Sequence, residues 1–333
     1  MTTHLITGGA GFIGSHYCHY WAAKYPQDQL IVLDKLTYAG RLENLTSLIN
    51  QGTITFIKGD ICDRELLAEI FEKHTIDQVV HFAAESHVDR SIDDADAFIK
   101  TNVLGTQCLL DAARAHNTRF HHVSTDEVYG ALGLEDPPFA EGAPYRPNSP
   151  YSASKAASNH LARAYHVTYG LPVTISNCSN NYGFRQHEEK LIPKTIHCVL
   201  EGKPIPLYGD GKHVRDWLHV DDHCRAIDAI VSSPEATGEY NIAGHEEIPN
   251  VQIVETICKY IEEKYSFPNI PKPATSLITP VKDRLGHDRR YALETPRIEN
   301  QLGFRPAISF EDGIKETIDQ VIAKRLSTAS EQL

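Results

Sequence analysis

The segment Thr7-Gly8-Gly9-Ala10-Gly11-Phe12-Ile13-Gly14 lies between a short apolar run, His4–Thr7, and a longer helical pattern, Phe12–Lys24. The glycines at positions 9, 11 and 14 fit the spacing G-x-G-x-x-G, in which small residues let the backbone turn tightly and approach a pyrophosphate. The first turn of the following helix adds free amide donors and a partial positive charge. Glycines also form ordinary turns, so the motif alone is weak. Its place between a strand and a helix predicts a dinucleotide-binding loop.

An acidic residue follows this loop at the distance that a dinucleotide site requires. The run Leu30–Asp34 ends about 20 residues after the last glycine, where a carboxylate hydrogen-bonds the adenosine ribose. Because its charge repels a 2′-phosphate, Asp34 favours NAD over NADP, although the cation of Lys35 beside it weakens this preference. Asp60 follows the third expected strand, where its side chain either contacts the adenine or caps the next helix.

The order of elements in the first half predicts the fold class. Short β-rich runs alternate with longer helical ones, which is typical of a parallel, doubly wound α/β sheet of the Rossmann type. The expected strands are His4–Thr7, Leu30–Asp34, Thr53–Gly59, Gln78–Phe82, Phe120–Thr125 and Pro172–Asn177. The expected helices include Phe12–Lys24, Arg64–Lys73, Asp96–His116 and Tyr151–Tyr169.

The second half is less regular and predicts a smaller α/β substrate-binding region. Irregular stretches over Gly133–Pro150, Asn180–Glu189 and Pro268–Pro280 are long enough to line a site. We expect a NAD-binding domain over residues 1–176, to which residues 217–243 return, and a substrate region over residues 177–216 and 244–333. The polar tail after Leu326 is expected to be frayed.

Composition argues against several classes of function. The chain of 333 residues has a formal net charge of −12, and such an acidic protein gains nothing from the counterion release that drives nucleic-acid binding. We expect neither a signal peptide nor a membrane span, since no apolar run is long enough. Seven cysteines without a C-x-x-C pair favour reduced thiols in the cytoplasm. The 18 histidines show no metal-binding spacing, so we expect no metal.

Tyr151 and Lys155 lie four residues apart at the start of a helical pattern, so they share one helix face. A tyrosine normally titrates near ~10, which is too high for a base at neutral pH. A lysine ammonium and a positively charged nicotinamide would lower this pKa and turn the pair into a proton acceptor for an alcohol. The same spacing is common on surface helices, and it is the Rossmann context that favours catalysis.

The triplet Thr125-Asp126-Glu127 follows the fifth expected strand, at the edge where doubly wound sheets bind ligands. Thr125 offers a hydroxyl group. Neighbouring carboxyl groups can have their pKa values pushed apart by the environment, so that one acts as an acid and the other as a base. A solvated acidic turn would contain the same residues, so the triplet by itself leaves both interpretations open.

Together these motifs resemble the extended short-chain dehydrogenase/reductase superfamily and, within it, the dTDP-glucose 4,6-dehydratases. The similarity spans nearly the whole chain. Beyond the glycine loop, Tyr-x-x-x-Lys and Ser124–Gly130, it rests on Ala83–Ser91, Asn177–Gly183, Glu189–Pro193, Arg215–Leu218 and Gly286–Tyr291. The Thr-Asp-Glu triplet is the selective feature, because the related 4-epimerases and decarboxylases do not normally contain it.

The resemblance implies an intramolecular hydride transfer in dTDP-glucose, with tightly bound NAD that is recycled in each turnover. Tyr151, assisted by Lys155 and Thr125, would remove the proton of the C4 hydroxyl while NAD takes the C4 hydride. Glu127 would then take the C5 proton and Asp126 would protonate the departing C6 hydroxyl. Return of the hydride to C6 and reprotonation of C5 would give dTDP-4-keto-6-deoxyglucose, and the net loss of water makes the enzyme a hydro-lyase.

The resemblance also assigns binding residues. The cofactor contacts that it implies are Gly8, Gly11, Phe12, Ile13, Gly14, Asp34, Lys35, Leu36, Thr37, Asp60, Ile61, Phe82, Ala83, Ala84, Ser86, Thr101, Tyr151, Lys155 and Asn181. The substrate contacts that it implies are Ser86, His87, Thr125, Asn180, Lys190, Leu191, Pro206, Tyr208, Arg215, Asn250, Arg284 and His287. Arg215 is assigned to the diphosphate, because a guanidinium group binds phosphate through two parallel hydrogen bonds.

Two segments depart from the family pattern near the expected substrate pocket. Phe184–Glu188 stands where the family usually has prolines and an aromatic residue, and Leu285 replaces the proline of Asp-Arg-Pro-Gly-His. These departures leave the catalytic residues intact and concern substrate preference.

The family is usually a homodimer, joined through the helices that correspond here to Asp96–His116 and Tyr151–Tyr169. Ala156, Ala157, Leu161 and Ala164 are compatible with an intermolecular four-helix bundle, but they could equally pack against the sheet.

Three functions remain to be separated. A 4-epimerase is disfavoured by Asp126 and Glu127, whereas a dehydratase specific for UDP-glucose is not separated from the dTDP-glucose enzyme by any residue identified above. A non-catalytic NAD-binding protein on the same fold would be expected to lose a catalytic residue, and this chain keeps the set together.

Overall fold

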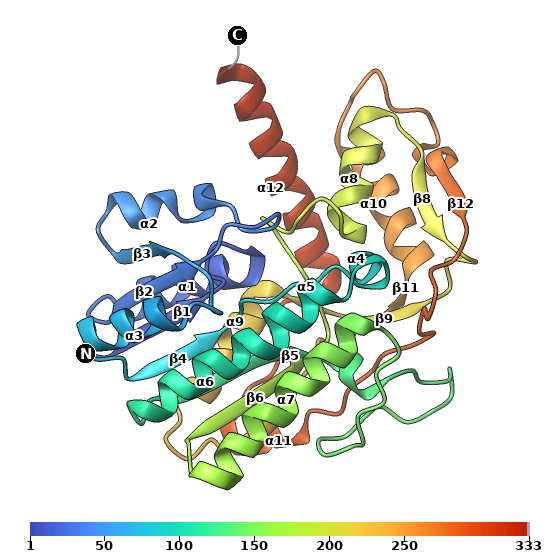
Figure 1. Ribbon diagram of the computed structural model, residues 1–333. Coiled ribbons are helices and arrows are strands. Elements are labelled where there is room, and N and C mark those ends of the chain that lie inside the picture. The colour runs from blue at the N-terminus through green and yellow to red at the C-terminus, as the bar shows by residue number, and fades with distance from the viewer. Residues whose placement is uncertain (332–333) are drawn as a thin grey trace.

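A seven-stranded parallel sheet forms the centre of the protein in a computed structural model that describes residues 1–331 (Figure 1). Its strands follow the order β10-β6-β5-β4-β1-β2-β3. Their bounds are Thr3–Thr7 for β1, Gln29–Asp34 for β2, Ile54–Lys58 for β3, Gln78–His81 for β4, Arg119–Thr125 for β5, Val173–Cys178 for β6 and Gly238–Ile242 for β10. The first six match the expected strands within one or two residues, which confirms the doubly wound fold class.

The strand order reverses beside β1, which pairs with β2 on one side and with β4 on the other. At such a reversal the loops that leave the carboxyl ends of neighbouring strands diverge to opposite faces and open a crevice. The glycine loop follows β1 and the Thr125-Asp126-Glu127 triplet follows β5, so both lie at this carboxyl edge. The topology therefore brings the two motifs to one place.

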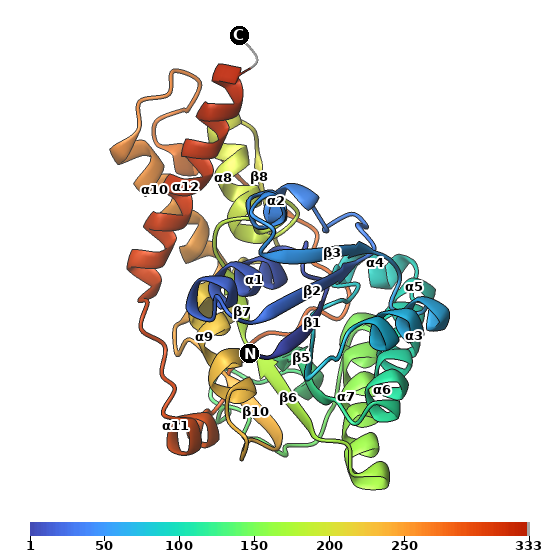
Figure 2. The ribbon, with the colours of Figure 1, turned by 90° about the vertical axis from the view of Figure 1, so that its left-hand side faces the viewer.

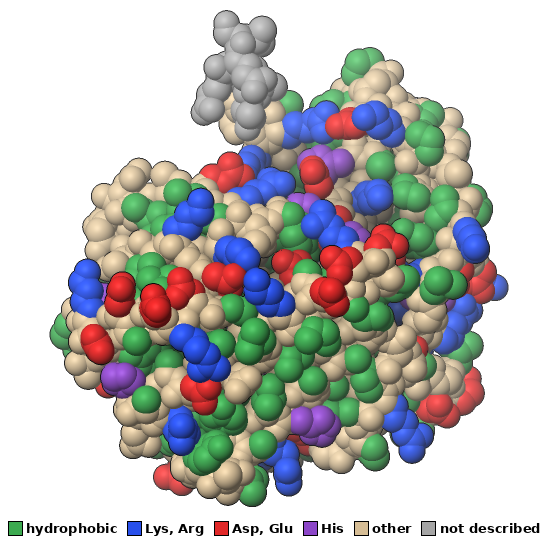
Figure 3. Space-filling model, viewed as in Figure 1, with side chains coloured by type: hydrophobic (Ala, Val, Ile, Leu, Met, Phe, Trp, Pro, Cys, Tyr) green, Lys and Arg blue, Asp and Glu red, His purple; other side chains and the backbone are tan. Residues whose placement is uncertain are grey.

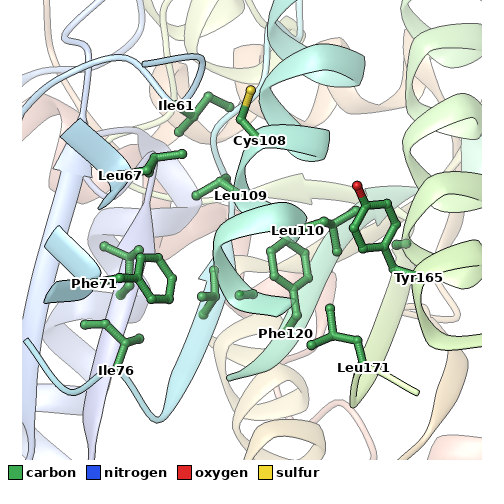
Figure 4. Close-up of a cluster of buried hydrophobic side chains, with 14 of the residues drawn as sticks. Ile61, Leu67, Phe71, Ile76, Cys108, Leu109, Leu110, Phe120, Tyr165 and Leu171 are labelled. Carbon is green, nitrogen blue, oxygen red and sulfur yellow. The ribbon is translucent and has the colours of Figure 1, made fainter. Parts of the chain in front are cut away.

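Helices cover both faces of the sheet (Figure 2). One face packs against α3 (Arg64–Lys73), α6 (Thr106–Ala115) and α7 (Pro150–Tyr169), and the other packs against α1 (Phe12–Lys24) and α9 (Val220–Val231). Figure 4 shows the first contact layer, in which Phe71 from α3, Leu109 and Leu110 from α6 and Tyr165 from α7 surround Phe120 of β5. Burial of apolar side chains on both faces explains why β2 contains the continuous hydrophobic run Leu30–Leu33.

The expected helix Asp96–His116 is divided into three parts: α5 (Asp96–Phe98), the π-helical segment η2 (Ile99–Gly105) and α6. Gly105 lies at the junction, where an added Cβ would come within 2.5 Å of the Ile61 side chain. The helix therefore approaches Ile61 closely at this junction, and Thr101 of η2 lies at the edge of the central cavity.

The remaining short helices join these layers. They are η1 (Leu42–Leu45), α2 (Thr46–Asn50), α4 (Val88–Asp93) and η3 (Asp126–Tyr129).

The second half builds its own core beside the sheet. Two small sheets are formed by β7 (Asn180–Tyr182), β9 (Val214–His219) and β11 (Glu247–Pro249), and by β8 (Ile205–Tyr208) and β12 (Ile278–Val281). The helical elements are α8 (Leu191–Glu201), α10 (Asn250–Lys264), η4 (Ala274–Leu277), α11 (Pro296–Leu302) and α12 (Phe310–Glu331). Apolar side chains of α8, α10 and α12 pack on Trp217 and Tyr182 in one buried cluster.

Residues 217–243 divide between the two halves. The strand β9 pairs with β7 and β11, whereas α9 packs on the main sheet and β10 joins it beside β6. The domain boundaries expected from the sequence stay a prediction.

The chain is more regular than expected in three segments. The tail after Leu326 continues as helix α12 up to Glu331, and Gln332 and Leu333 lie outside the described residues; the fraying of this tail stays a prediction. The stretch Asn180–Glu189 contains β7, and Pro268–Pro280 contains η4 and the start of β12.

None of the helices within residues 1–331 has the length and apolar character needed to cross a bilayer. All seven cysteines lie in the described part of the chain, and none forms a disulfide there.

Candidate active site

One cavity of about 510 Å³ opens along the carboxyl edge of the main sheet and runs between the two halves of the protein. Every predicted catalytic, cofactor and substrate residue lines it, with the exception of Leu36. The Leu36 side chain packs into the apolar layer beneath α1, while its backbone N–H donates to Asp34 Oδ1 at 2.8 Å. Figure 3 shows charged and histidine side chains gathered in the hollow between the two halves.

The glycine loop forms one end of this cavity, which we call the cofactor end: the loop Gly8–Gly14 with Asp34 and Asp60. An added Cβ would lie 2.6 Å from the Ala83 amide nitrogen at Gly8, and 2.8 Å from the Gly9 Cα at Gly14, where it would also collide with the Gly8 carbonyl oxygen. The helix α1 starts directly behind the loop, and its N-cap residue Gly11 supplies no capping side chain. The amide donors of the first turn are therefore available to a pyrophosphate, so this end fits a dinucleotide.

Asp34 ends β2 with its side chain only 8% exposed. It accepts hydrogen bonds from the Ala10 amide at 2.9 Å and from the Leu36 amide at 2.8 Å, so the carboxylate fixes both the glycine loop and the turn after β2. Burial raises its pKa, although these two amide donors oppose the shift. Lys35 forms an ion pair with Asp60 at 2.8 Å, so the cation that weakened the preference for NAD already has a carboxylate partner.

Tyr151 and Lys155 lie in the first two turns of α7, whose start is fixed by a capping box between Ser149 and Ser152. Lys155 is buried, its Nζ donates to the Val123 carbonyl at 2.8 Å, and burial lowers its pKa to about 8. The lowering of the Tyr151 pKa by Lys155 and a bound nicotinamide stays a prediction, and the protein alone shows the opposing influences. Burial and then the charge of Glu127 raise this pKa well above its usual value, while the Thr125 hydroxyl opposes them.

The triplet Thr125-Asp126-Glu127 joins the end of β5 to the turn η3. Thr125 caps this turn: its hydroxyl donates to Asp126 Oδ1 at 3.2 Å and accepts the Glu127 amide at 3.3 Å. Asp126 is 2% exposed, and its Oδ2 is buried without a hydrogen-bond partner among the described residues. Asp126 also lines the cavity, so this unpaired oxygen is a candidate partner for a substrate hydroxyl.

The pKa values of the two carboxyl groups are both raised. Burial and then the neighbouring Glu127 charge raise the pKa of Asp126 well above its usual value, against the opposing charge of Arg215. Burial also raises the pKa of Glu127, against the charges of Arg215 and Lys190. Asp126 is thus suited to donate a proton, and Glu127, with two cations near it, is the better candidate for a base.

Arg215 lies at the opposite end of the cavity, which we call the substrate end: Arg215 with Tyr208, Arg284 and His287. Its guanidinium is buried, donates to the Val214 carbonyl at 2.8 Å and the Asp288 carbonyl at 2.9 Å, and lies over the Tyr291 ring at 4.3 Å. A surface salt bridge, the alternative for this arginine, is therefore not its role. A buried guanidinium without a carboxylate partner in these hydrogen bonds is suited to bind a phosphate.

Sequence reasoning missed a cluster beside the catalytic residues. The Glu189 carboxylate lies 3.3 Å from His87, 3.5 Å from His187 and 3.7 Å from Lys190, and Lys190 Nζ also donates to the Ser86 carbonyl at 3.0 Å. Glu189 belongs to the family motif Glu189–Pro193. Nothing in the sequence, however, indicated that its carboxylate would contact His87.

His213, Asp283 and His287 place three potential metal ligands within 4.8 Å of one another, among the described residues. The two histidine rings stack at 3.6 Å with an angle of 16° between their planes, and Arg215, Arg284 and Arg289 lie near enough to act on their charges. Stacked imidazoles do not direct their lone pairs to one point, and three arginines disfavour a cation. The absence of a metal stays our prediction.

Three comparisons place this geometry among known proteins. The family model of GDP-mannose 4,6 dehydratase matches residues 5–317. A dTDP-glucose 4,6-dehydratase from Haemophilus influenzae is 49% identical over 329 residues, which cover 96% of this chain and 97% of that protein. The chain belongs to the dTDP-glucose 4,6-dehydratase family.

Solved structures agree with this family membership. The crystal structure of DesIV, a dTDP-glucose 4,6-dehydratase from Streptomyces venezuelae with NAD and TYD bound, superimposes with a TM-score of 0.90 at 46% identity and 98% coverage of both chains. A UDP-glucose 4-epimerase from Thermus thermophilus in complex with NAD gives a TM-score of 0.85 at 29% identity, covering 96% of this chain and 99% of that one. The fold is therefore shared with epimerases, and the side chains must decide the reaction.

Proposed function

We propose that this chain is a dTDP-glucose 4,6-dehydratase that converts dTDP-glucose into dTDP-4-keto-6-deoxyglucose. The observation that carries the proposal is the pair Asp126 and Glu127 at the carboxyl end of β5, with Tyr151 and Lys155 on the facing helix. Elimination of water needs an acid and a base next to adjacent carbons, and the pair supplies both. An epimerase needs neither group, because it only oxidises and reduces one carbon.

The cofactor is NAD, which when bound accepts a hydride from the sugar and returns it within the same turnover. Gly8–Gly14 would hold its pyrophosphate and Asp34 its adenosine ribose, as the shape of the loop and the buried carboxylate suggest. Lys155, fixed on the Val123 carbonyl, would place its ammonium group beside the nicotinamide ribose and the Tyr151 hydroxyl.

Each catalytic side chain has one proposed task. Tyr151 takes the proton of the sugar C4 hydroxyl; burial raises its pKa in the protein alone, and a bound positive nicotinamide would lower it. Glu127 takes the C5 proton once C4 is a ketone, and Asp126 protonates the C6 hydroxyl as water leaves. The buried, unpaired Oδ2 of Asp126 is the atom that would meet this hydroxyl.

The test is to incubate the purified protein with dTDP-glucose without added reductant and to measure loss of one water by mass spectrometry. Asp126→Asn and Glu127→Gln should each lower kcat by about 100-fold or more, because each removes one proton transfer. The control is Glu188→Gln, an exposed carboxyl next to the cavity, which should keep full activity. Water loss from UDP-glucose instead of dTDP-glucose would move the assignment to the other nucleotide. Interconversion of C4 epimers without water loss would refute the dehydratase.

A homodimer is the assembly that we propose for the enzyme. On the outer surface of η2 and α7, the side chains of Leu104, Val167 and Tyr169 are 42%, 65% and 54% exposed. Of the helix residues expected at the interface, Ala164 is exposed, whereas Ala156 and Leu161 pack inward on buried clusters. Light scattering should give about twice the chain mass of 37.2 kDa, and Ala164→Glu should give the monomer. The cytoplasmic location stays a prediction.

A further inference from the structure

An ion pair that none of the roles above uses bridges the two halves of the protein at the cavity. Asp89 lies in α4, directly after the cofactor-side strand β4, and Arg284 lies in the loop after β12 of the substrate half. Arg284 Nε donates to Asp89 Oδ1 at 2.5 Å and Nη2 donates to Asp89 Oδ2 at 2.9 Å, so the pair is bidentate. Both residues line the cavity, and 195 positions of the sequence separate them.

Tyr208 completes this arrangement. Its hydroxyl donates to Asp89 Oδ2 at 3.4 Å, and the guanidinium of Arg284 lies 5.2 Å from the centre of its ring. Although burial alone would raise the pKa of Asp89, the hydrogen bonds and the charge of Arg284 hold it below its usual value, so the carboxylate is ionised. Arg284 is thereby fixed on one edge by Asp89 and on one face by Tyr208.

One edge of the Arg284 guanidinium remains available to a ligand. Nε and Nη2 are engaged by Asp89, and Nη1 has no hydrogen-bond partner among the residues that the structure describes. The charge of Arg284 also acts on Glu127, His287 and Lys190, so the guanidinium lies within the electrostatic environment of the substrate end. A preorganised arginine with a free N–H edge loses less side-chain entropy when it binds an anion.

We propose that Asp89 is a positioning residue: it holds Arg284 across the cavity so that its free edge binds the diphosphate of the nucleotide. The identity of that nucleotide rests on the function proposed above, whereas the action of Asp89 through Arg284 does not depend on turnover. The pair also joins α4 to the substrate half.

The experiment measures dTDP binding by calorimetry in the NAD-loaded protein and, separately, KM and kcat for dTDP-glucose. Asp89→Asn keeps the size of the side chain and removes the ion pair, so the Kd of dTDP and the KM should rise about tenfold while kcat changes less than about threefold. Asp89→Glu keeps the charge and should recover part of the affinity. The matched control is Asp210→Asn, which removes the bidentate and exposed pair of Asp210 with Arg289, outside the cavity, and should leave both constants unchanged.

A double variant tests whether Asp89 acts through Arg284. Arg284→Met should weaken dTDP binding, and adding Asp89→Asn to it should weaken binding no further, since the group to be positioned is already gone. Equal or tighter dTDP binding by Asp89→Asn, or additive losses in the double variant, would overturn the proposal. If wild type binds dTDP but releases no water from dTDP-glucose, the proposed function fails and the positioning role is still measured by the Kd values.

Discussion

The cofactor end and the substrate end of the cavity are formed by different kinds of groups. Gly8, Gly14 and the start of α1 shape the cofactor end through backbone atoms and close packing, and Asp34 fixes that backbone. The substrate end is shaped by long charged side chains: Arg215 bound to backbone carbonyls, and Arg284 bound to Asp89. The first depends on shape, and the second depends on charge held in place.

This difference predicts different tolerance to substitution. Where backbone atoms form the site, one added methyl group displaces the site itself, because the loop has no side chain that can move aside. Where side chains form the site, a substitution removes one interaction and leaves the remaining donors in position. A single substitution at the cofactor end should therefore abolish most NAD binding, whereas a single substitution at the substrate end should only weaken nucleotide binding.

Gly14→Ala should give the largest effect. The added Cβ would lie 2.8 Å from the Gly9 Cα and would collide with the Gly8 carbonyl oxygen, so the phosphate loop must shift. Displacement of a binding loop by about an ångström costs on the order of 100-fold in function, and we expect at least this loss of NAD affinity. The measurement is the NAD released from the denatured variant, compared with wild type by absorbance.

The control for Gly14→Ala is Gly52→Ala. Gly52 has φ of +68° and nothing within 4 Å of an added Cβ, so the cost is local backbone strain of about 1 kcal/mol. This variant should lose some thermal stability and keep its NAD. A Gly14→Ala protein that purifies with as much NAD as wild type would show that the loop is not close-packed around the cofactor.

Low pH should destabilise the main sheet, which carries both ends of the cavity. His121 of β5 is fully buried, with hydrogen bonds to the hydroxyls of Thr174 at 2.9 Å and Ser176 at 3.1 Å. Burial lowers its pKa to about 3, whereas an unfolded histidine titrates near ~6.5. Between these values only the unfolded chain is protonated, so stability is present above pH ~6.5 and is lost as the pH falls toward the folded pKa.

The size of this acid effect follows from the two pKa values. One such histidine lowers the free energy of unfolding by about 2 kcal/mol between pH 7 and pH 5. His121→Gln should therefore reduce the pH dependence of urea unfolding by about that amount. Thr174→Val, which removes a partner but keeps the ring, should lower stability about equally at both pH values. If the free energy of unfolding of His121→Gln falls between pH 7 and pH 5 as much as that of wild type, the link between this ring and acid sensitivity is refuted.

The same contrast explains what the sequence could and could not predict. The cofactor end was found from the glycine spacing and Asp34, because contiguous backbone geometry leaves a contiguous signature. The proposed catalytic residues come from two short motifs that the parallel topology brings to one edge. The contact of Glu189 with His87 and the pair of Asp89 with Arg284 were not found, because these partners are distant in the sequence and only the folded chain brings them together.

The Tyr151 pKa shows a second limit of sequence reasoning. The spacing to Lys155 correctly places both groups on one face of α7, but it does not reveal the burial and the Glu127 charge that raise the Tyr151 pKa in the protein alone. Distances along a helix predict which groups are neighbours. They do not predict desolvation, which depends on every element packed around the site.

Asp34→Asn should give the smallest effect and tests whether charge matters at the cofactor end at all. The asparagine oxygen can accept one of the two amide hydrogen bonds, from Ala10 or Leu36, and its NH₂ group must then face the other donor. We expect about tenfold weaker NAD binding and improved relative binding of NADP, because the repulsion of a 2′-phosphate is removed.

Asp28→Asn is the control. Asp28 accepts the Thr2 amide at 2.8 Å and the Trp21 ring N–H at 3.2 Å, and it precedes β2 rather than ending it. It should lose stability without a change in the ratio of NAD to NADP affinity. If Asp34→Asn leaves that ratio unchanged as well, Asp34 acts only as a structural acceptor for the loop, and the cofactor end is selective by shape alone.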